Sequence, residues 1–176
     1  MKLIKFIKYN FLNVFRYSLF NKNISIRRPQ RIDRSVKILT SNGGKIEIGK
    51  GCHFLRNTTV QSDSGHISIG NGTFINENAK IVSHKKITIG ERCSFGPNVV
   101  IYDHDHDYKN ARGTYVSDEI VIGNNVWIGA NAVILKNSVI EDNCVIAAGT
   151  VVKGHIPSNT LAFNPKELEM RTIKLN

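Results

Sequence analysis

The feature that most restricts the fold of this chain is a six-residue period, which is clearest from residue 122 onward. An aliphatic residue occupies the first place of every unit: Ile122, Ile128, Ile134, Ile140, Ile146 and Val152. A small or compact residue stands four places later: Val126, Ala132, Ser138, Cys144 and Thr150. Neither helical periodicity nor strand alternation generates a period of six, whereas a short strand followed by a tight corner does. The period therefore predicts an all-β solenoid in which three units form one triangular coil.

Earlier parts of the chain carry the same pattern. Its aliphatic and aromatic positions are Ile48, Phe54 and Val60, then Ile69, Ile75 and Ile81, then Ile89, Phe95 and Ile101. Successive coils begin 21, 20, 33 and 18 residues apart (69 − 48, 89 − 69, 122 − 89 and 140 − 122). Glycine follows the large residue at Gly49, Gly70, Gly90, Gly96, Gly123 and Gly129, where a corner favours a residue without Cβ.

One coil is longer than the others because it contains the polar segment 103–119, which is rich in His, Asp and Tyr. A loop that leaves a rigid solenoid is a common place for chemistry, since the coils on either side can position it. We therefore expect residues 103–119 to form an ejected active-site loop.

The three cysteines, Cys52, Cys93 and Cys144, fall at the small inward position of their units. They show no CxxC spacing, so the sequence predicts core packing rather than a disulfide framework or a zinc site. Reduced thiols favour a cytoplasmic protein.

The chain of 176 residues is long enough for one domain. We expect a basic N-terminal extension over residues 1–30, a β-helix domain over residues 31–156 and a C-terminal tail over residues 157–176. Within residues 1–22, apolar residues at helical spacing alternate with lysine and arginine, which predicts a short amphipathic helix rather than a membrane-spanning helix or a secretory signal. This helix either packs on the protein or lies on the inner face of a membrane.

The charge is strongly positive, with 24 Lys and Arg against 14 Asp and Glu, for a net charge of +10. This balance favours polyanionic partners, such as phosphorylated cofactors, acidic polysaccharides or an anionic membrane. Nucleic acid is disfavoured because the chain has no zinc-finger spacing, basic recognition helix or aromatic RNA-binding signature.

Two strings carry a resemblance to a known family. They are Ile122-Gly-Asn-Asn-Val-Trp-Ile-Gly and the segment from Ile89 through Phe95-Gly-Pro-Asn to Tyr102, which leads into the polar insertion. Over residues 45–166 the chain resembles the hexapeptide-repeat acyltransferases, in particular the maltose, galactoside and polysaccharide O-acetyltransferases. The resemblance implies a left-handed parallel β-helix, acetyl-CoA as co-substrate, and a homotrimer with active sites between subunits.

The same resemblance assigns roles to individual residues on the acceptor side. The family's catalytic histidine aligns with His106, and an asparagine that contacts acceptor hydroxyls aligns with Asn76. His84 lies where relatives contact the acceptor, and Asp103 and His104 are expected to contact substrate beside the base.

On the cofactor side, Trp127 aligns with the residue that flanks the pantetheine arm. The backbone around Gly129, Ala130 and Ala148 and the side chain of Lys153 are expected to bind the cofactor, and no metal is expected. The chain departs from the family at Lys153-Gly154, where Thr-Lys is common, and at its N-terminus, which lacks the helical region of maltose acetyltransferases. The second departure favours a cell-surface polysaccharide or its precursor as acceptor.

Imidazole is suited to remove a proton from a hydroxyl near neutral pH, so His106 is expected to act as the general base. Asp103, Asp105 and Asp107 are all close enough in sequence to orient it, and His104 is expected on the same side of an extended backbone. His53, His66 and His155 receive no role.

Three other functions fit parts of the pattern. Xenobiotic acetyltransferases that act on antibiotics also carry a histidine in their loop. A γ-class carbonic anhydrase shares the fold but requires three zinc histidines, and the Asp-His-Asp-His-Asp string lacks that spacing. A non-catalytic β-helix would be expected to show ordered rows of threonine, which this chain does not have.

Overall fold

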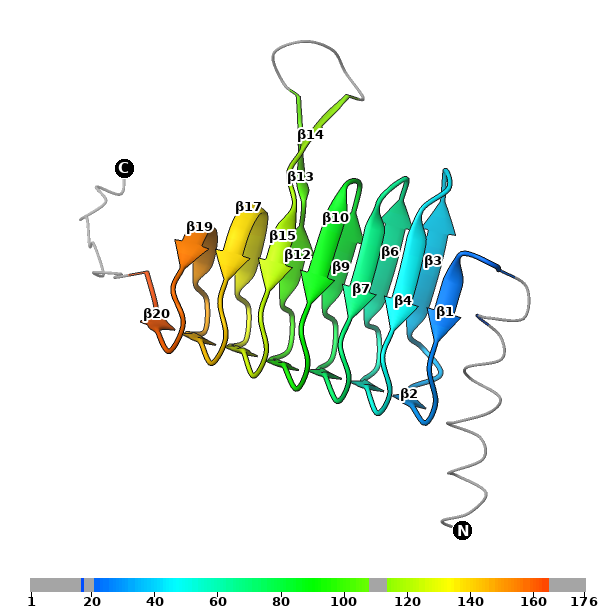
Figure 1. The fold of residues 1–176 in the computed structure, drawn as a ribbon, viewed down its shortest axis with the longest axis horizontal. Helices are drawn as coiled ribbons and strands as arrows, with labels where there is room; N and C mark the ends of the chain where they lie inside the picture. The colour runs from blue at the N-terminus through cyan, green and yellow to red at the C-terminus, as the bar shows by residue number, and fades with distance from the viewer. Residues whose placement is uncertain (1–16, 18–20, 108–113, 165–176) are drawn as a thin grey trace, which may run out of the picture.

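The chain folds into a left-handed parallel β-helix with a triangular cross-section (Figure 1). The computed structural model describes Tyr17, residues 21–107 and residues 114–164. The strands of the coils lie on three faces, and each pairs in parallel with its equivalent in a neighbouring coil. The predicted all-β solenoid is confirmed.

The strands of the three faces follow one another along the helix axis. The first face contains β1 (Ile24–Ile26), β4 (Lys45–Ile48), β7 (His66–Ile69), β10 (Lys86–Ile89) and β15 (Ile120–Ile122). The second face contains β2 (Arg31–Ile32), β5 (His53–Phe54), β8 (Phe74–Ile75), β11 (Ser94–Phe95), β16 (Trp127–Ile128), β18 (Val145–Ile146) and β20 (Leu161–Ala162). The third face contains β3 (Lys37–Ser41), β6 (Thr59–Asp63), β9 (Lys80–Ser83) and β12 (Val100–Tyr102). Two longer strands, β17 (Val133–Ile140) and β19 (Val151–Ile156), run from the third face onto the first.

The interior consists of stacked inward-facing side chains. The predicted large positions, such as Phe54, Ile75 and Ile128, are fully buried, and so are the small positions that alternate with them. All three cysteines are buried and free, and the Cys93 thiol lies 3.0 Å from the Gly123 carbonyl oxygen. Burial raises the pKa of the Cys52 and Cys93 thiols, which disfavours the thiolate form and agrees with a packing role.

The corners use two residue types for two different reasons. Glycine is required where the backbone of the next coil comes too close for a side chain. A Cβ at Gly70 would lie 2.5 Å from the Gly90 carbonyl oxygen, and a Cβ at Gly129 would lie 2.5 Å from the Ala148 nitrogen. The left-handed conformation falls mainly on asparagine, with φ near 60° at Asn143. These asparagines also bond along the axis, because Asn143 donates to Asn159 Oδ1 over 3.2 Å.

Replacing Gly70 by alanine is expected to destabilise the protein by about 1–3 kcal/mol, because the new methyl group would overlap a backbone carbonyl that has no room to move. The free energy of unfolding in urea measures this effect. Ser68→Ala, at an outward position of the same coil, is the matched control and should change stability by no more than about 0.5 kcal/mol. Equal stability of the two variants would contradict the close stacking of the corners.

The coils extend beyond the predicted limits of residues 31 and 156. At the start, β1 pairs with β4, and at the end β20 pairs with β18, so residues 24–162 belong to the solenoid. Tyr17 is helical and buried, and its hydroxyl donates to the Val36 carbonyl oxygen. The rest of the helix predicted over residues 1–22 lies almost entirely outside the described residues. Within the described part, no helix has the length and apolar character needed to span a membrane.

Candidate active site

The polar insertion forms an antiparallel hairpin rather than an irregular loop. Its strands, β13 (His104–His106) and β14 (Tyr115–Ser117), project from the edge between the third and first faces, which we call the hairpin edge (Figure 1). The register places His106 opposite Tyr115. Residues 108–113 lie outside the described part of the chain. Because the hairpin rises from a rigid coil, its base is fixed relative to the neighbouring corners.

Asp103 anchors the hairpin at its base. The carboxylate is fully buried and accepts hydrogen bonds from the Ser83 hydroxyl (2.6 Å) and from the backbone nitrogens of His84 (2.8 Å) and Lys85 (2.8 Å). It therefore holds the corner of the preceding coil. Asp103 was predicted to contact substrate, but its side chain has no exposed surface in this structure, and its contacts are with the corner that it holds.

Asp103 also holds His104. The Nδ1 atom of His104 lies 3.1 Å from Asp103 Oδ1, and the His104 side chain is only 13% exposed. A carboxylate partner at Nδ1 favours the tautomer that carries its proton there, which leaves Nε2 as the acceptor nitrogen. Of the three aspartates considered as orienting groups, Asp103 thus orients His104 rather than His106.

His106 is exposed on the hairpin, two residues further along the same strand. Its ring centroid lies 4.9 Å from that of Tyr115, and the ring of Tyr115 is also 5.2 Å from that of His104. One tyrosine therefore touches both histidines, as expected if they share a side of the strand. His106 combines a defined position with an accessible ring, which a general base requires.

His84 completes the group from the corner of the preceding coil. Its ring centroid is 3.9 Å from that of His104 and 4.4 Å from that of Tyr115. Burial lowers the pKa of His84, and the neighbouring His104 lowers it further, which favours the neutral form of His84. We call His84, His104, His106 and Tyr115 the histidine cluster. Among the described residues, no group of three or more His, Cys, Asp or Glu side chains is arranged to hold a metal ion.

Two lysines connect the hairpin to the coils. Lys136 Nζ lies 3.7 Å from Asp105 Oδ2, and Lys85 Nζ lies 3.3 Å from Asp118 Oδ1. Sequence analysis missed Lys136 and Tyr115. Tyr115 could have been noticed as an aromatic residue in a polar insertion. Nothing in the sequence distinguishes Lys136, whose contact with the hairpin depends on the stacking of its coil next to the one that carries the hairpin.

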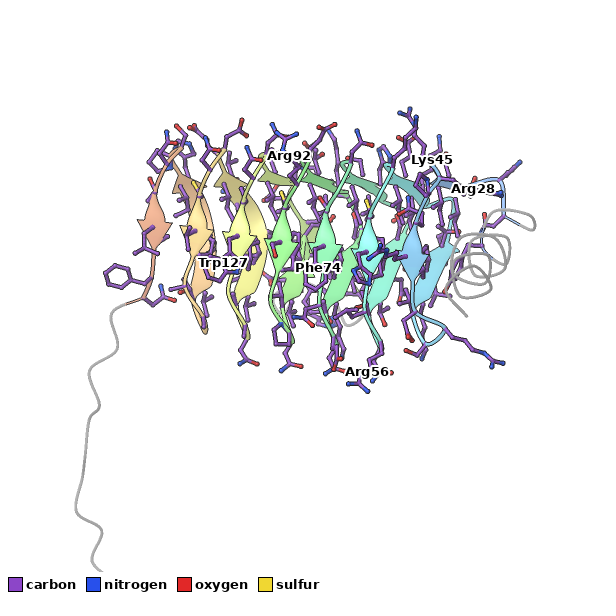
Figure 2. The ribbon with its side chains drawn as sticks, turned by 90° about the horizontal axis from the view of Figure 1, so that it is seen from below. Arg28, Lys45, Arg56, Phe74, Arg92 and Trp127 are labelled. Atoms are coloured by element: carbon purple, nitrogen blue, oxygen red, sulfur yellow. The ribbon has the colours of Figure 1, made fainter. Side chains whose placement is uncertain are left out.

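A second group of predicted residues lies on the opposite side of the prism. Trp127 projects from β16 on the second face and is 58% exposed (Figure 2). Gly129, Ala130 and Ala148 form the adjoining corner, where the backbones approach closely. Asn76 occupies the same corner two coils earlier, and its Oδ1 accepts a hydrogen bond from the Glu77 nitrogen (2.8 Å).

The predicted site residues of one chain therefore fall into two groups, which we call the two half-sites. The hairpin edge carries the histidine cluster, and the opposite second face with its corner carries Asn76, Trp127 and the backbone that was predicted to bind the cofactor. The exposed Lys153 follows the third-face part of β19, so it lies toward the hairpin edge and away from Trp127. The core of the solenoid therefore stands between Trp127 and the histidine cluster of the same chain.

Comparison with known proteins gives a consistent result. Residues 119–154 match the family described as bacterial transferase hexapeptide (six repeats). A galactoside O-acetyltransferase of Lactococcus lactis subsp. lactis (strain IL1403) is 30% identical over 157 residues, which cover 88% of this chain and 73% of that protein. A galactoside O-acetyltransferase of Escherichia coli (strain K12) is 38% identical over 104 residues, which cover 57% of this chain and about half (51%) of that enzyme.

Two solved structures share the fold. A maltose O-acetyltransferase from Clostridium difficile 630 superposes with a TM-score of 0.54 at 23% identity, covering 93% of this chain and 79% of that chain. A mutant of AntD, an N-acyltransferase from Bacillus cereus in complex with dTDP and coenzyme A, superposes with a TM-score of 0.70 at 18% identity, covering 85% and 81%.

Proposed function

This chain belongs to the hexapeptide-repeat acyltransferases, and from that premise we propose that it transfers an acetyl group from acetyl-CoA to a sugar hydroxyl. The observation that carries the proposal is the exposed His106 on a hairpin whose base is fixed by the buried Asp103. Such an arrangement suits proton removal from an acceptor that approaches from solvent.

In the proposed reaction, His106 takes the proton of the acceptor hydroxyl as its oxygen attacks the thioester carbonyl. Backbone N–H groups stabilise the tetrahedral oxyanion, and the protonated His106 then protonates the departing thiolate. Asp103 and His104 act as positioning residues, since they fix the first strand of the hairpin.

We further propose that three copies of the chain assemble with the active sites between them. The two half-sites lie on opposite sides of one chain, so a neighbouring copy must bring Trp127 to His106. Three outward residues of the third face, Val100, Val133 and Val151, form an apolar column in register, which suits contact with another subunit.

Trp127→Ala is expected to raise the KM for acetyl-CoA about tenfold or more, because the exposed indole is the largest apolar surface at the proposed donor site. Initial rates over a range of acetyl-CoA concentrations measure this. Val121→Ala, an exposed apolar residue on the first face, is the control and should leave KM unchanged.

The same variant tests where the donor half-site comes from. When Trp127→Ala and His106→Ala chains are refolded together, about one in four interfaces should combine an intact His106 with an intact Trp127. At acetyl-CoA concentrations below the wild-type KM, where either variant alone is slow, the mixture should therefore recover activity. If mixing restores nothing while each variant still assembles, the two residues act within one chain and the proposed arrangement is wrong.

The proposed acceptor is a cell-surface polysaccharide or its cytoplasmic precursor, and acetyl-CoA consumption measured across sugars, nucleotide sugars and antibiotics tests this. We expect turnover of a saccharide. The second candidate function is an antibiotic acetyltransferase, and turnover of antibiotics alone would favour it. The relatives named for galactoside and maltose support a saccharide acceptor.

A further inference from the structure

A cavity of about 450 Å³ lies on the second face over the first coils, outside both half-sites. Its lining includes Pro29, Gln30, Arg31, His53 and Phe74. Sequence analysis gave none of these residues a role. The cavity therefore requires an explanation of its own.

Three of the lining side chains form one outward column. Arg31 pairs in register with His53, and His53 with Phe74, on successive strands of the second face. Strands in a sheet are about 4.8 Å apart, so the column spans about 10 Å. The rings of His53 and Phe74 meet edge to face, with centroids 5.4 Å apart. The column thus offers an aromatic surface at one end and a guanidinium group at the other.

The positive charge of Arg31 is not neutralised by the described part of the chain. Other arginines form ion pairs: Arg56 Nε lies 2.8 Å from Glu77 Oε1, and Arg92 Nη1 lies 3.4 Å from Glu91 Oε2. In contrast, no carboxylate oxygen of the described residues lies within 4.0 Å of the Arg31 guanidinium. Burial lowers the pKa of His53, and the charge of Arg31 lowers it further. Both effects identify a positive, partly desolvated site that an anion would complete.

The column also leads toward the proposed donor site. Phe74 is followed by Ser94 and then by Trp127 at the same register on the second face, and Figure 2 shows Phe74 and Trp127 on one surface. Ser94 is the one residue between the two aromatic residues in this column, and its side chain is short. A ligand in the cavity could therefore continue along this face toward Trp127.

We propose that the cavity binds an anionic part of the acceptor: a sugar ring packs on Phe74, and its phosphate or carboxylate group binds Arg31 with the His53 ring as a hydrogen-bond partner. This inference rests on the proposed function and adds that the acceptor is an acidic or phosphorylated saccharide. Arginine suits either anion because its planar fork donates two parallel hydrogen bonds to phosphate or carboxylate.

Calorimetric titration of the full chain with three probes tests the proposal: galactose 1-phosphate, glucuronic acid and the neutral methyl galactoside. We expect one or both anionic probes to bind, and Arg31→Ala to weaken that binding about tenfold or more while leaving the neutral sugar unaffected. Comparison of the affinities for galactose 1-phosphate and glucuronic acid identifies whether phosphate or carboxylate is preferred. Lys45→Ala removes one positive charge on the first face and is the matched control, expected to have no effect.

A second readout separates this site from catalysis. The NMR signals of the His53 ring should shift on addition of the anionic probe, whether or not acetyl transfer occurs, and Phe74→Ala should weaken binding of that probe. Equal affinity of wild type and Arg31→Ala for both anionic probes, or equal effects of Arg31→Ala and Lys45→Ala, would overturn the proposal. If the protein acetylates neutral sugars but does not bind the anionic probes, the proposed subsite is refuted and the proposed function stands. If it binds the anionic probes but transfers no acetyl group, the proposed function is refuted and the subsite stands.

Discussion

Replacing His106 by alanine is expected to lower kcat at least about 10²-fold, with a much smaller change in the KM for acetyl-CoA. His106 is the histidine of the cluster that is exposed on the hairpin, and its removal leaves no base to take the acceptor proton. Steady-state kinetics with the accepted sugar measure the effect. The rate of wild type should also rise with pH as a single group loses its proton, and this dependence should disappear in the variant.

Two further substitutions make the test specific. His155→Ala removes an exposed histidine on the first-face part of β19, whose ring contacts Glu141 rather than the histidine cluster, and should leave kcat unchanged. His104→Ala should lower kcat less than His106→Ala and should retain the pH dependence of wild type, because His104 positions the hairpin. If His104→Ala removed the pH dependence while His106→Ala retained activity, the base would be the histidine held by Asp103.

Asp103→Ala is expected to destabilise the protein by about 2–4 kcal/mol and to lower kcat at least about tenfold. The substitution removes the acceptor for the Ser83 hydroxyl and for the His84 and Lys85 nitrogens, and leaving such buried donors unsatisfied costs about 1–3 kcal/mol each, partly offset by water that enters. It also frees His104. Urea unfolding and the hydrogen-exchange rates of the His84 and Lys85 amides measure the two structural effects.

Asp105→Ala is the matched control for the loss of one carboxylate from the same part of the chain. Asp105 is more than half exposed, and its ion pair with Lys136 spans 3.7 Å, so this substitution should cost no more than about 1 kcal/mol. Unchanged hydrogen exchange at His84 and Lys85 in Asp103→Ala would show that the buried carboxylate does not hold the corner.

The sequence predicted most of the fold because the solenoid repeats one local rule. The alternation of large and small inward residues, as at Ile128 and Ala132, requires only that each residue stack on its equivalent in the next coil. The glycine after each large residue was predicted for the same reason, although the structure shows that close backbone approach, rather than a left-handed conformation, requires it. The limits of the solenoid were less predictable, because terminal coils such as that of β1 depart from the repeat.

The candidate site was predicted only in part. Resemblance selected His84, His104 and His106, and the structure brings them together around Tyr115. Resemblance could not show that Asp103 is buried, since a carboxylate in a polar insertion is expected to be exposed. Its burial follows from the preceding coil, whose Ser83 and backbone nitrogens surround it.

The sequence by itself determined the solenoid, its inward columns and the point at which the chain leaves it, because each depends on residues six or eighteen places apart. Only the tertiary structure decided which aspartate holds which histidine, that the insertion is a hairpin, and that His106 and Trp127 lie on opposite sides of one chain. These relations depend on how separate coils are stacked in space, and a repeat that treats every coil alike carries no information about them.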